Sequence, residues 1–267
     1  MRILDNHPFQ GAQALFVTNA TRDTTASGTT YSGTLSFPLS TAWEGTNIVG
    51  PGTVGLVGIY ACSGSSARTI DTVAFSGTYG TITGTELGKV DGVDNCCALY
   101  AIDLSAYEED GSASVTVDVT LSGTIANGLA FLGVPVTGID WPISYNAATV
   151  STGDPMTANV TYNARGVIAF AATSNNATSG QSWFSVLNGV ARASTTGGLY
   201  LSNVTYSSRT HCIGVLSRYA SGQWDGLETL SVDSPGTFSV GVDYSSDGVS
   251  ETSGTVSSPR LIVAAID

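Results

Sequence analysis

The feature that most constrains this fold is an alternation of apolar and polar residues along several short segments. From Ser114 to Leu121, three valines and Leu121 occupy every second position, with Ser, Thr or Asp between them. The segment Thr237 to Tyr244 repeats the pattern, with Phe, Val and Tyr set against Thr, Ser, Gly and Asp. Successive side chains of a strand point to opposite faces, so this period predicts β-strands with one buried face. We find no segment with the period of an amphipathic helix.

Other segments are apolar at nearly every position. They are Val54–Tyr60, Leu129–Val134, Val167–Ala172 and Leu261–Ile266. Strands of this composition are typically covered on both faces. Clusters of Gly, Ser, Asn and Asp separate the runs, and these residues favour tight turns. The sequence therefore predicts an all-β sandwich in which some strands are central.

The same succession of segments occurs twice. The pairs are Asn19–Ala20 with Asn146–Ala147, Gly55–Ala61 with Gly166–Ala172, Cys97–Ala101 with Cys212–Leu216, and Gly111–Val119 with Gly236–Tyr244. Each half then closes on an apolar strand, around Leu129 and Leu261. Chance similarity among strands rich in Val, Gly and Ser is the alternative. The shared order favours an internal duplication, with halves at 1–137 and 138–267. The junction 133–142 is short and apolar, so we expect one joined jelly-roll-like sandwich rather than two separate tandem sandwiches.

Charge is sparse and negative. Charged residues make up 11% of the chain, the net charge is −12, and Lys89 is the only lysine. An average protein has about 25% charged residues. No basic stripe is present, so we expect neither nucleic-acid nor membrane binding. A surface of hydroxyls and glycine suits a protein that neighbours cover, because little charge keeps copies apart. Adaptation of the composition to the organism or to salt is the alternative.

The N-terminus and the cysteines bear on location. Met1–Asp5 lacks the apolar stretch of a secretory signal, and no run reaches the length of a membrane span. We therefore expect synthesis in a host cytoplasm. The spacing of Cys62, Cys96, Cys97 and Cys212 matches no zinc pattern. We expect buried thiols, with the neighbouring pair pointing to opposite faces of a strand. A disulfide between Cys62 and one of that pair is the alternative.

The segment order of the first half resembles that of β-sandwich virion proteins of tailed bacteriophages and gene transfer agents. The residues that carry the resemblance are Val54–Tyr60, a hairpin at Ile70–Gly77, Ala98–Ile102, the Gly-led strand Gly111–Leu121, and Gly133–Val134. Members serve as capsid decoration proteins, head fibres or spikes, and tail-tip proteins. The resemblance implies a virion protein that forms homo-oligomers and contacts the major capsid protein or a tail or fibre protein. The glycine-rich hairpin at Phe75–Gly77 has no clear counterpart in the second half.

Catalytic motifs are sparse. Only His7 and His211 could act as histidine bases, no nucleophile elbow occurs, and His211 precedes a cysteine in an expected strand. The acidic run Glu108–Gly111 is expected to be a solvated turn. We therefore expect no enzyme activity. A polysaccharide-degrading enzyme, with carboxylates brought together from distant strands, is the third-ranked hypothesis.

Two loops and three side chains remain as candidate binding sites. Asp91–Asn95 and Asp243–Glu251 are conceivable calcium loops, but Asx-turns explain them more simply, and we expect no cofactor. Trp224 lies in the loop-like Ser221–Gly226. We assign Trp224, Asp225 and Trp183 as ligand or subunit contacts. The favoured function is a structural virion protein. The alternative is a carbohydrate- or receptor-binding tail domain, in which an exposed Trp binds a surface glycan.

Overall fold

The computed structural model describes most of the first half and the strands of the second. The described residues are 13–14, 19–23, 29–39, 42–43, 46–47, 54–62, 68–92, 95–125, 129–137, 141–152, 156–162, 166–172, 182–187, 190–192, 200–206, 209–217, 236–245 and 260–266. Within these ranges the regular elements are antiparallel strands and one 3-10 helix. The prediction of an all-β sandwich is confirmed.

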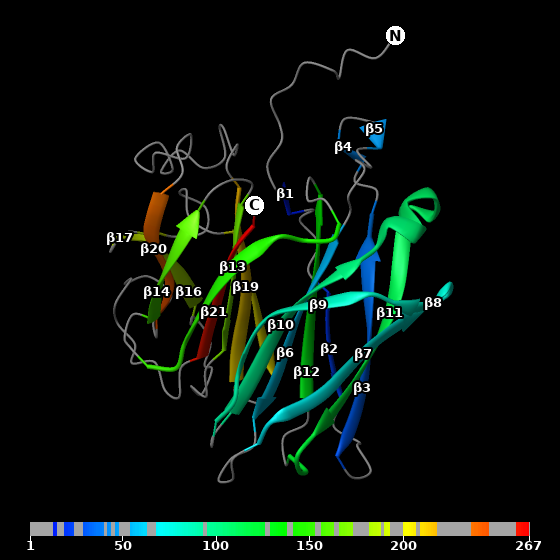
Figure 1. Cartoon of the computed structure of the whole chain (residues 1–267), viewed down its shortest axis with the longest axis horizontal. Coiled ribbons are helices and arrows are strands. Elements are labelled where there is room, and N and C mark those ends of the chain that lie inside the picture. The colour runs from blue at the N-terminus through cyan, green and yellow to red at the C-terminus, as the bar shows by residue number, and fades with distance from the viewer. Residues whose placement is uncertain are drawn as a thin grey trace.

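Strands of the first half form two sheets (Figure 1). We call the sheet that packs against the second half the inner sheet and the other one the outer sheet. The inner sheet of the first half has the order β1 (Gln13–Ala14), β12 (Leu129–Thr137), β6 (Val54–Cys62), β10 (Asn95–Asp103) and β9 (Gly84–Val90), and β2 (Asn19–Asp23) also pairs with β12. The outer sheet has the order β3 (Thr30–Pro38), β11 (Ser112–Leu121), β7 (Ile70–Gly77) and β8 (Gly80–Ile82). A small separate ribbon joins β4 (Ala42–Trp43) to β5 (Thr46–Asn47).

Strands of the second half form two further sheets. The inner sheet of the second half has the order β13 (Tyr145–Val150), β21 (Arg260–Ile266), β15 (Gly166–Ala172), β19 (Arg209–Ser217) and β18 (Tyr200–Tyr206). Its outer sheet has the order β14 (Met156–Tyr162), β20 (Gly236–Ser245), β16 (Ser182–Leu187) and β17 (Val190–Arg192).

Both halves have the strand order of a jelly roll. If β2, β3, β6, β7, β8, β10, β11 and β12 are numbered in chain order, the inner sheet reads 1-8-3-6 and the outer sheet reads 2-7-4-5. The same two orders result in the second half when its strands are numbered in the same way, as β13, β14, β15, β16, β17, β19, β20 and β21. Such interleaving, in which successive strands alternate between two facing sheets, is the jelly-roll arrangement. Each pair of segments that is similar in sequence falls on equivalent strands of the two halves.

Two local expectations differ from the structure. Ile70–Gly77, expected to be a hairpin, is the single strand β7, and the turn follows at Thr78–Tyr79 before β8 returns. The acidic run expected to be a turn belongs to the 3-10 helix η1 (Ser105–Asp110). Gly111, with φ of 68°, ends this helix in the left-handed conformation that glycine adopts at little cost.

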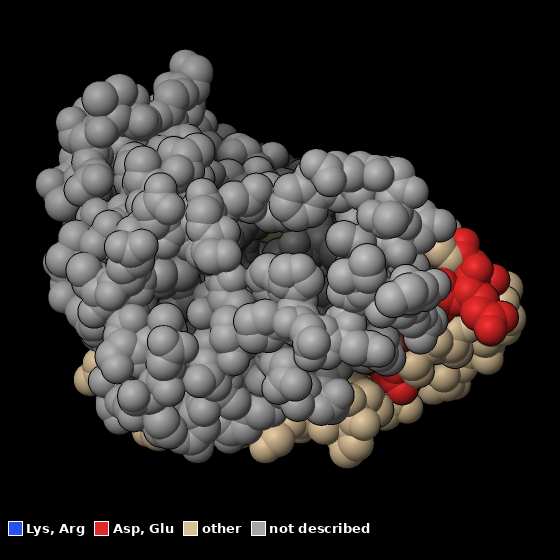
Figure 2. All heavy atoms as spheres, turned by 90° about the horizontal axis from the view of Figure 1, so that it is seen from above, with Lys and Arg blue, Asp and Glu red and all other residues tan. Residues whose placement is uncertain are grey.

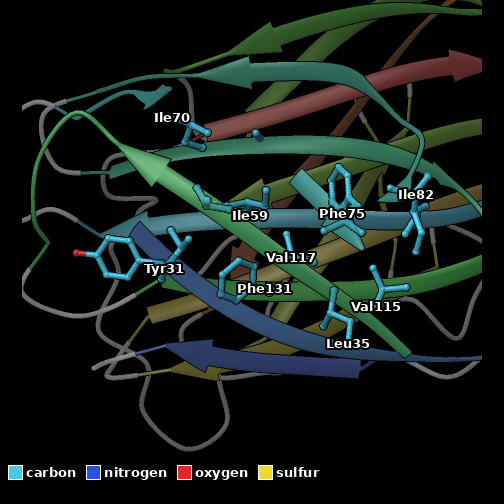
Figure 3. Close-up of a cluster of buried hydrophobic side chains, with 14 of the residues drawn as sticks. Tyr31, Leu35, Ile59, Ile70, Phe75, Ile82, Val115, Val117 and Phe131 are labelled. Carbon is cyan, nitrogen blue, oxygen red and sulfur yellow. The ribbon is translucent and has the colours of Figure 1, made fainter. Parts of the chain in front are cut away.

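The core of the first half lies between its inner and outer sheets (Figure 3). Val115, Val117 and Val119 of β11 are fully buried, as the alternation of that segment predicts. They pack with Leu35 of β3 and Phe131 of β12 in one cluster. Full burial of such a side chain contributes about 1.5–3 kcal/mol, so the alternating strands supply much of the stability of this sandwich.

The two inner sheets pack against each other and join the halves. Leu56 and Leu99 of the first half share a buried cluster with Ile262 of the second. A Cβ at Gly88 would lie 2.6 Å from Cγ2 of Ile262, so the absence of a side chain lets the sheets approach closely. The hydroxyl of Tyr145 donates to the carbonyl oxygen of Glu86 across the same contact, at 2.6 Å.

This junction explains the fully apolar segments. Val57 and Ile59 of β6 belong to the core of the first half, whereas Val54 and Leu56 belong to the junction cluster. A strand between two apolar layers needs apolar residues at both its odd-numbered and its even-numbered positions, because these point to opposite faces. The prediction that Val54–Tyr60 is covered on both faces is confirmed.

Candidate interaction surfaces

The outer sheet of the first half presents a face of hydroxyl groups, which we call the hydroxyl face. It consists of the outward residues Thr30, Ser32, Thr34, Ser36, Ser112, Ser114, Thr116, Asp118, Thr120, Thr72, Ala74, Ser76 and Thr81. The register aligns them in rows across the strands. One row runs from Thr34 through Thr116 to Ser76 and Thr81.

Asp118 is the single charged side chain of the hydroxyl face. It lies opposite Ser32 of β3 and Ala74 of β7, in the middle of the sheet. Serine and threonine both donate and accept hydrogen bonds, and short side chains leave the face flat. Such a surface can contact a neighbour over a wide area without desolvating many charges, which is the costly step in forming an interface.

An exposed tyrosine marks one end of the first half, which we call the Tyr79 tip. Tyr79 is 60% exposed, more than any other large apolar side chain of the described residues. The centroid of its ring lies 5.0 Å from that of Tyr107, and its hydroxyl donates to Oδ2 of Asp110 at 2.9 Å. Gly80, with φ of 97°, allows the tight turn that projects the ring.

The Tyr79 tip is acidic. Glu109 and Asp110 of η1 are exposed, and Glu108 is half-buried. The hydrogen bond to Asp110, and then the charge of that carboxylate, raise the pKa of Tyr79 above its ordinary value. Figure 2 shows acidic side chains gathered at this side of the molecule, and no lysine or arginine of the described residues is visible in that view.

The side chains assigned from sequence as contacts are not brought together among the described residues. Trp224 and Asp225 lie outside those residues. Trp183 lies on β16, where it is paired with Tyr244 of β20, but its side chain is also outside what the structure describes. Their roles therefore stay predictions. Sequence reasoning missed Tyr79, although an aromatic residue between Gly77 and Gly80 is the same signal that singled out Trp224.

The neighbouring cysteines confirm one expectation. Both are buried free thiols of β10, and they point to opposite faces: Cys96 lies in the core of the first half and Cys97 in the junction cluster. Burial, with a smaller effect of Asp91, raises the pKa of Cys96 to about 12. Burial also raises the pKa of Cys97. Thiols held protonated in this way are poor nucleophiles and poor metal ligands.

The suggested calcium loops are partly described. Oδ1 of Asp91 accepts a hydrogen bond from the backbone N–H of Ile70 at 3.3 Å, so this carboxylate has a structural role at the start of β7. Asp94 lies outside the described residues, as do the residues from 246 to 251, and Asp243 is described only as part of β20. Within the described part of the chain, no group of three metal-ligating side chains occurs.

Comparisons with known proteins give no relative, since no family model, curated protein or solved structure matches this chain. In the part of the chain that the structure describes, no helix is long and apolar enough to span a membrane.

Proposed function

We propose that this chain is a structural protein of the capsid surface of a bacteriophage, and that it acts through protein–protein contacts. The observation that carries the proposal is the pair of jelly rolls, joined sheet to sheet through an apolar junction. Jelly rolls are a recurrent architecture of viral capsid domains. Because one architecture hosts several functions, the surface must supply the second argument.

The surface of the first half suits assembly. The hydroxyl face extends across all four strands of the outer sheet, and the only exposed charges on these strands are Asp118 and, at the start of β7, Asp71. A protein that must stay separate in solution normally carries mixed charge over such an area. A particle component instead meets identical neighbours, and closed symmetric arrays of copies are the common outcome. The segment-order resemblance to virion proteins agrees with this proposal.

The test is the composition of particles that contain the chain. Density-gradient-purified virions should contain this protein at a fixed ratio to the other shell proteins. Cryo-electron microscopy should place two jelly rolls per copy at the capsid surface. Absence from purified particles, or a location at the tail alone, would refute the proposal of a capsid-surface protein.

A carbohydrate- or receptor-binding role is a second candidate, and the Tyr79 tip favours it. Aromatic rings that project beside carboxylates and hydroxyls can stack on a sugar ring while the polar groups bind its hydroxyls. On this hypothesis Tyr79→Ala abolishes binding to host surface polysaccharide, measured by surface plasmon resonance. Tyr79→Phe keeps the ring, so it should retain most of the affinity. Equal affinities for the wild type and Tyr79→Ala would eliminate the tip as a glycan site.

A further inference from the structure

The ring of Tyr79 projects into solvent, yet several contacts fix its position. It packs against the ring of Tyr107, whose own side chain is buried, with the two ring planes inclined by 51°. The hydroxyl of Tyr107 accepts a hydrogen bond from the backbone N–H of Tyr79 at 3.4 Å, and the hydroxyl of Tyr79 donates to Asp110. The ring is therefore held in place before a partner binds, which lowers the entropy cost of binding.

The turn between β7 and β8 is built for this arrangement. A Cβ at Gly77 would collide with the hydroxyl of Tyr107, so glycine allows the turn to lie directly on that ring. At Gly80 a Cβ would meet nothing within 4 Å, and the residue is needed instead for its φ of 97°. Both glycines thus contribute to placing Tyr79 at the surface over Tyr107.

The groups beside the exposed ring are acidic. Asp110 accepts the hydrogen bond of the Tyr79 hydroxyl, and the charge of Glu109 also acts on that hydroxyl. Both carboxylates are exposed, and they belong to the acidic region that Figure 2 shows. The face of an aromatic ring is itself negative, and a phenol that donates to a carboxylate becomes more so. The ring and the carboxylates therefore favour the same kind of ligand, a cation.

We propose that the Tyr79 tip binds an arginine side chain of a protein partner. The guanidinium would lie over the exposed face of the Tyr79 ring and donate to the carboxylates of Asp110 and Glu109. A guanidinium is planar and carries several N–H donors, so it can stack on a ring and bind neighbouring carboxylates at once. The contact deepens the proposed structural role by naming the chemistry of a partner, and it rests on that role.

Charge decides between an arginine and other occupants of the tip. A second tip would repel the first, because both carry carboxylates. A neutral sugar could stack on the ring, but it would leave the charges of Asp110 and Glu109 without a counter-charge. An exposed ion pair alone contributes little, so the fixed ring supplies the part of the affinity that depends on shape.

The direct test measures binding of a short peptide of alternating glycine and arginine to the full chain by isothermal titration calorimetry. Tyr79→Leu keeps the charge of the tip and an apolar side chain, but it removes the ring. We expect this variant to bind the peptide about fivefold more weakly, the effect of one exposed cation–π contact. Asp110→Asn keeps the shape of the side chain, and loss of its charge should also weaken binding severalfold. A folded Tyr79→Leu protein, judged by circular dichroism, that binds like the wild type would overturn the proposal.

Asp118→Asn is the matched control for overall charge. It removes one exposed carboxylate of the hydroxyl face, roughly 24 Å along β11 from Gly111, at which η1 ends. This variant should bind the peptide like the wild type. An equal loss of affinity in Asp110→Asn and Asp118→Asn would show that the peptide responds to the net charge of −12 and not to the tip, which contradicts the proposal.

Matched peptides test the chemistry of the ligand and do not depend on the variants. Citrulline has the shape of arginine without its charge, so a citrulline peptide should not bind measurably. A lysine peptide should bind more weakly than the arginine peptide, because an ammonium group cannot stack flat on a ring. Affinity for either peptide equal to that for the arginine peptide would overturn the proposal. Binding of host polysaccharide but of no peptide would also overturn it, in favour of the glycan hypothesis.

The outcomes separate this proposal from the proposed function. If the arginine peptide binds and Tyr79→Leu weakens its binding, but the chain is absent from particles, the capsid role fails and the arginine site stands. If particles contain the chain at a fixed ratio while Tyr79→Leu leaves peptide binding unchanged, the arginine site fails and the capsid role stands.

Discussion

The contact between the two inner sheets should contribute measurably to stability, and Ile262 is the residue with which to test it. Its side chain is fully buried, and it approaches the first half where Gly88 leaves space. Ile262→Ala removes the Cγ1, Cγ2 and Cδ1 carbons. At about 0.8 kcal/mol for each buried carbon, the transfer free energy lost is about 2.4 kcal/mol. The void that remains adds to this loss, so we expect a total of about 3 kcal/mol.

The assay is urea unfolding of the full chain followed by tryptophan fluorescence and circular dichroism. Because Ile262 lies between the halves, its loss should also separate their unfolding into two transitions. Val263→Ala is the matched control. Val263 is fully buried too, but the next position along a strand points to the opposite face, away from the junction. This control should lower stability without separating the transitions. A wild-type midpoint for Ile262→Ala, or the same separation in both variants, would refute the reasoning.

Further predictions concern a buried hydrogen bond and two thiols. The hydroxyl of buried Tyr31 accepts from the N–H of Ile125 at 2.9 Å, so Tyr31→Phe leaves a buried donor unsatisfied. We expect a loss of about 2 kcal/mol, or about 6 °C in Tm by calorimetry; Tyr79→Phe, at an exposed bond, should change Tm little. Iodoacetamide at pH 8 should leave Cys96 and Cys97 unmodified in the folded chain and modify them in urea, as mass spectrometry can show. The pKa of Cys96 is raised by burial from 9.0 to about 12, so its contribution to stability is complete below pH 9. That contribution should fall as the pH rises from 9 to 12, because the unfolded thiol ionises first. Equal iodoacetamide labelling of Cys96 and Cys97 in folded and unfolded chains would contradict their burial.

Much of the sandwich could be predicted from periodicity, because burial acts on each strand locally. Val117 is buried and Asp118 is exposed, as their positions in the alternating segment require. The apolar β6 was predictable as a central strand for the same reason. The division of Gly80–Val90 into two strands of different sheets was not predictable. Its first part, β8, pairs with β7 in the outer sheet, and its second part, β9, pairs with β10 in the inner sheet. Such pairing depends on strands distant in sequence, which a local pattern does not record.

Surface sites were less predictable than the core. The low charge of the chain indicated an unusual surface, but it could not show that the hydroxyls gather on one sheet, because that requires the register of β3, β11 and β7. Exposure of Tyr79 depends on the turn at Gly80 and on the ring of Tyr107 beneath it. An aromatic residue in a turn can fold onto the sandwich or project from it, and the sequence alone is compatible with both arrangements.

The distribution of charge limits how copies of this chain can meet. Two cations of the first half bind its own backbone: Nζ of Lys89 donates to the carbonyl of Ile70 at 3.1 Å, and Nε of Arg68 donates to the carbonyl of Thr124 at 2.9 Å. They fasten the loops at one end of the sandwich, whereas the acids of η1 lie at the other end, around the Tyr79 tip. Two such tips repel each other, because both carry the same charge. The hydroxyl face lies away from this tip, so contact between identical copies is more favourable there than between two tips.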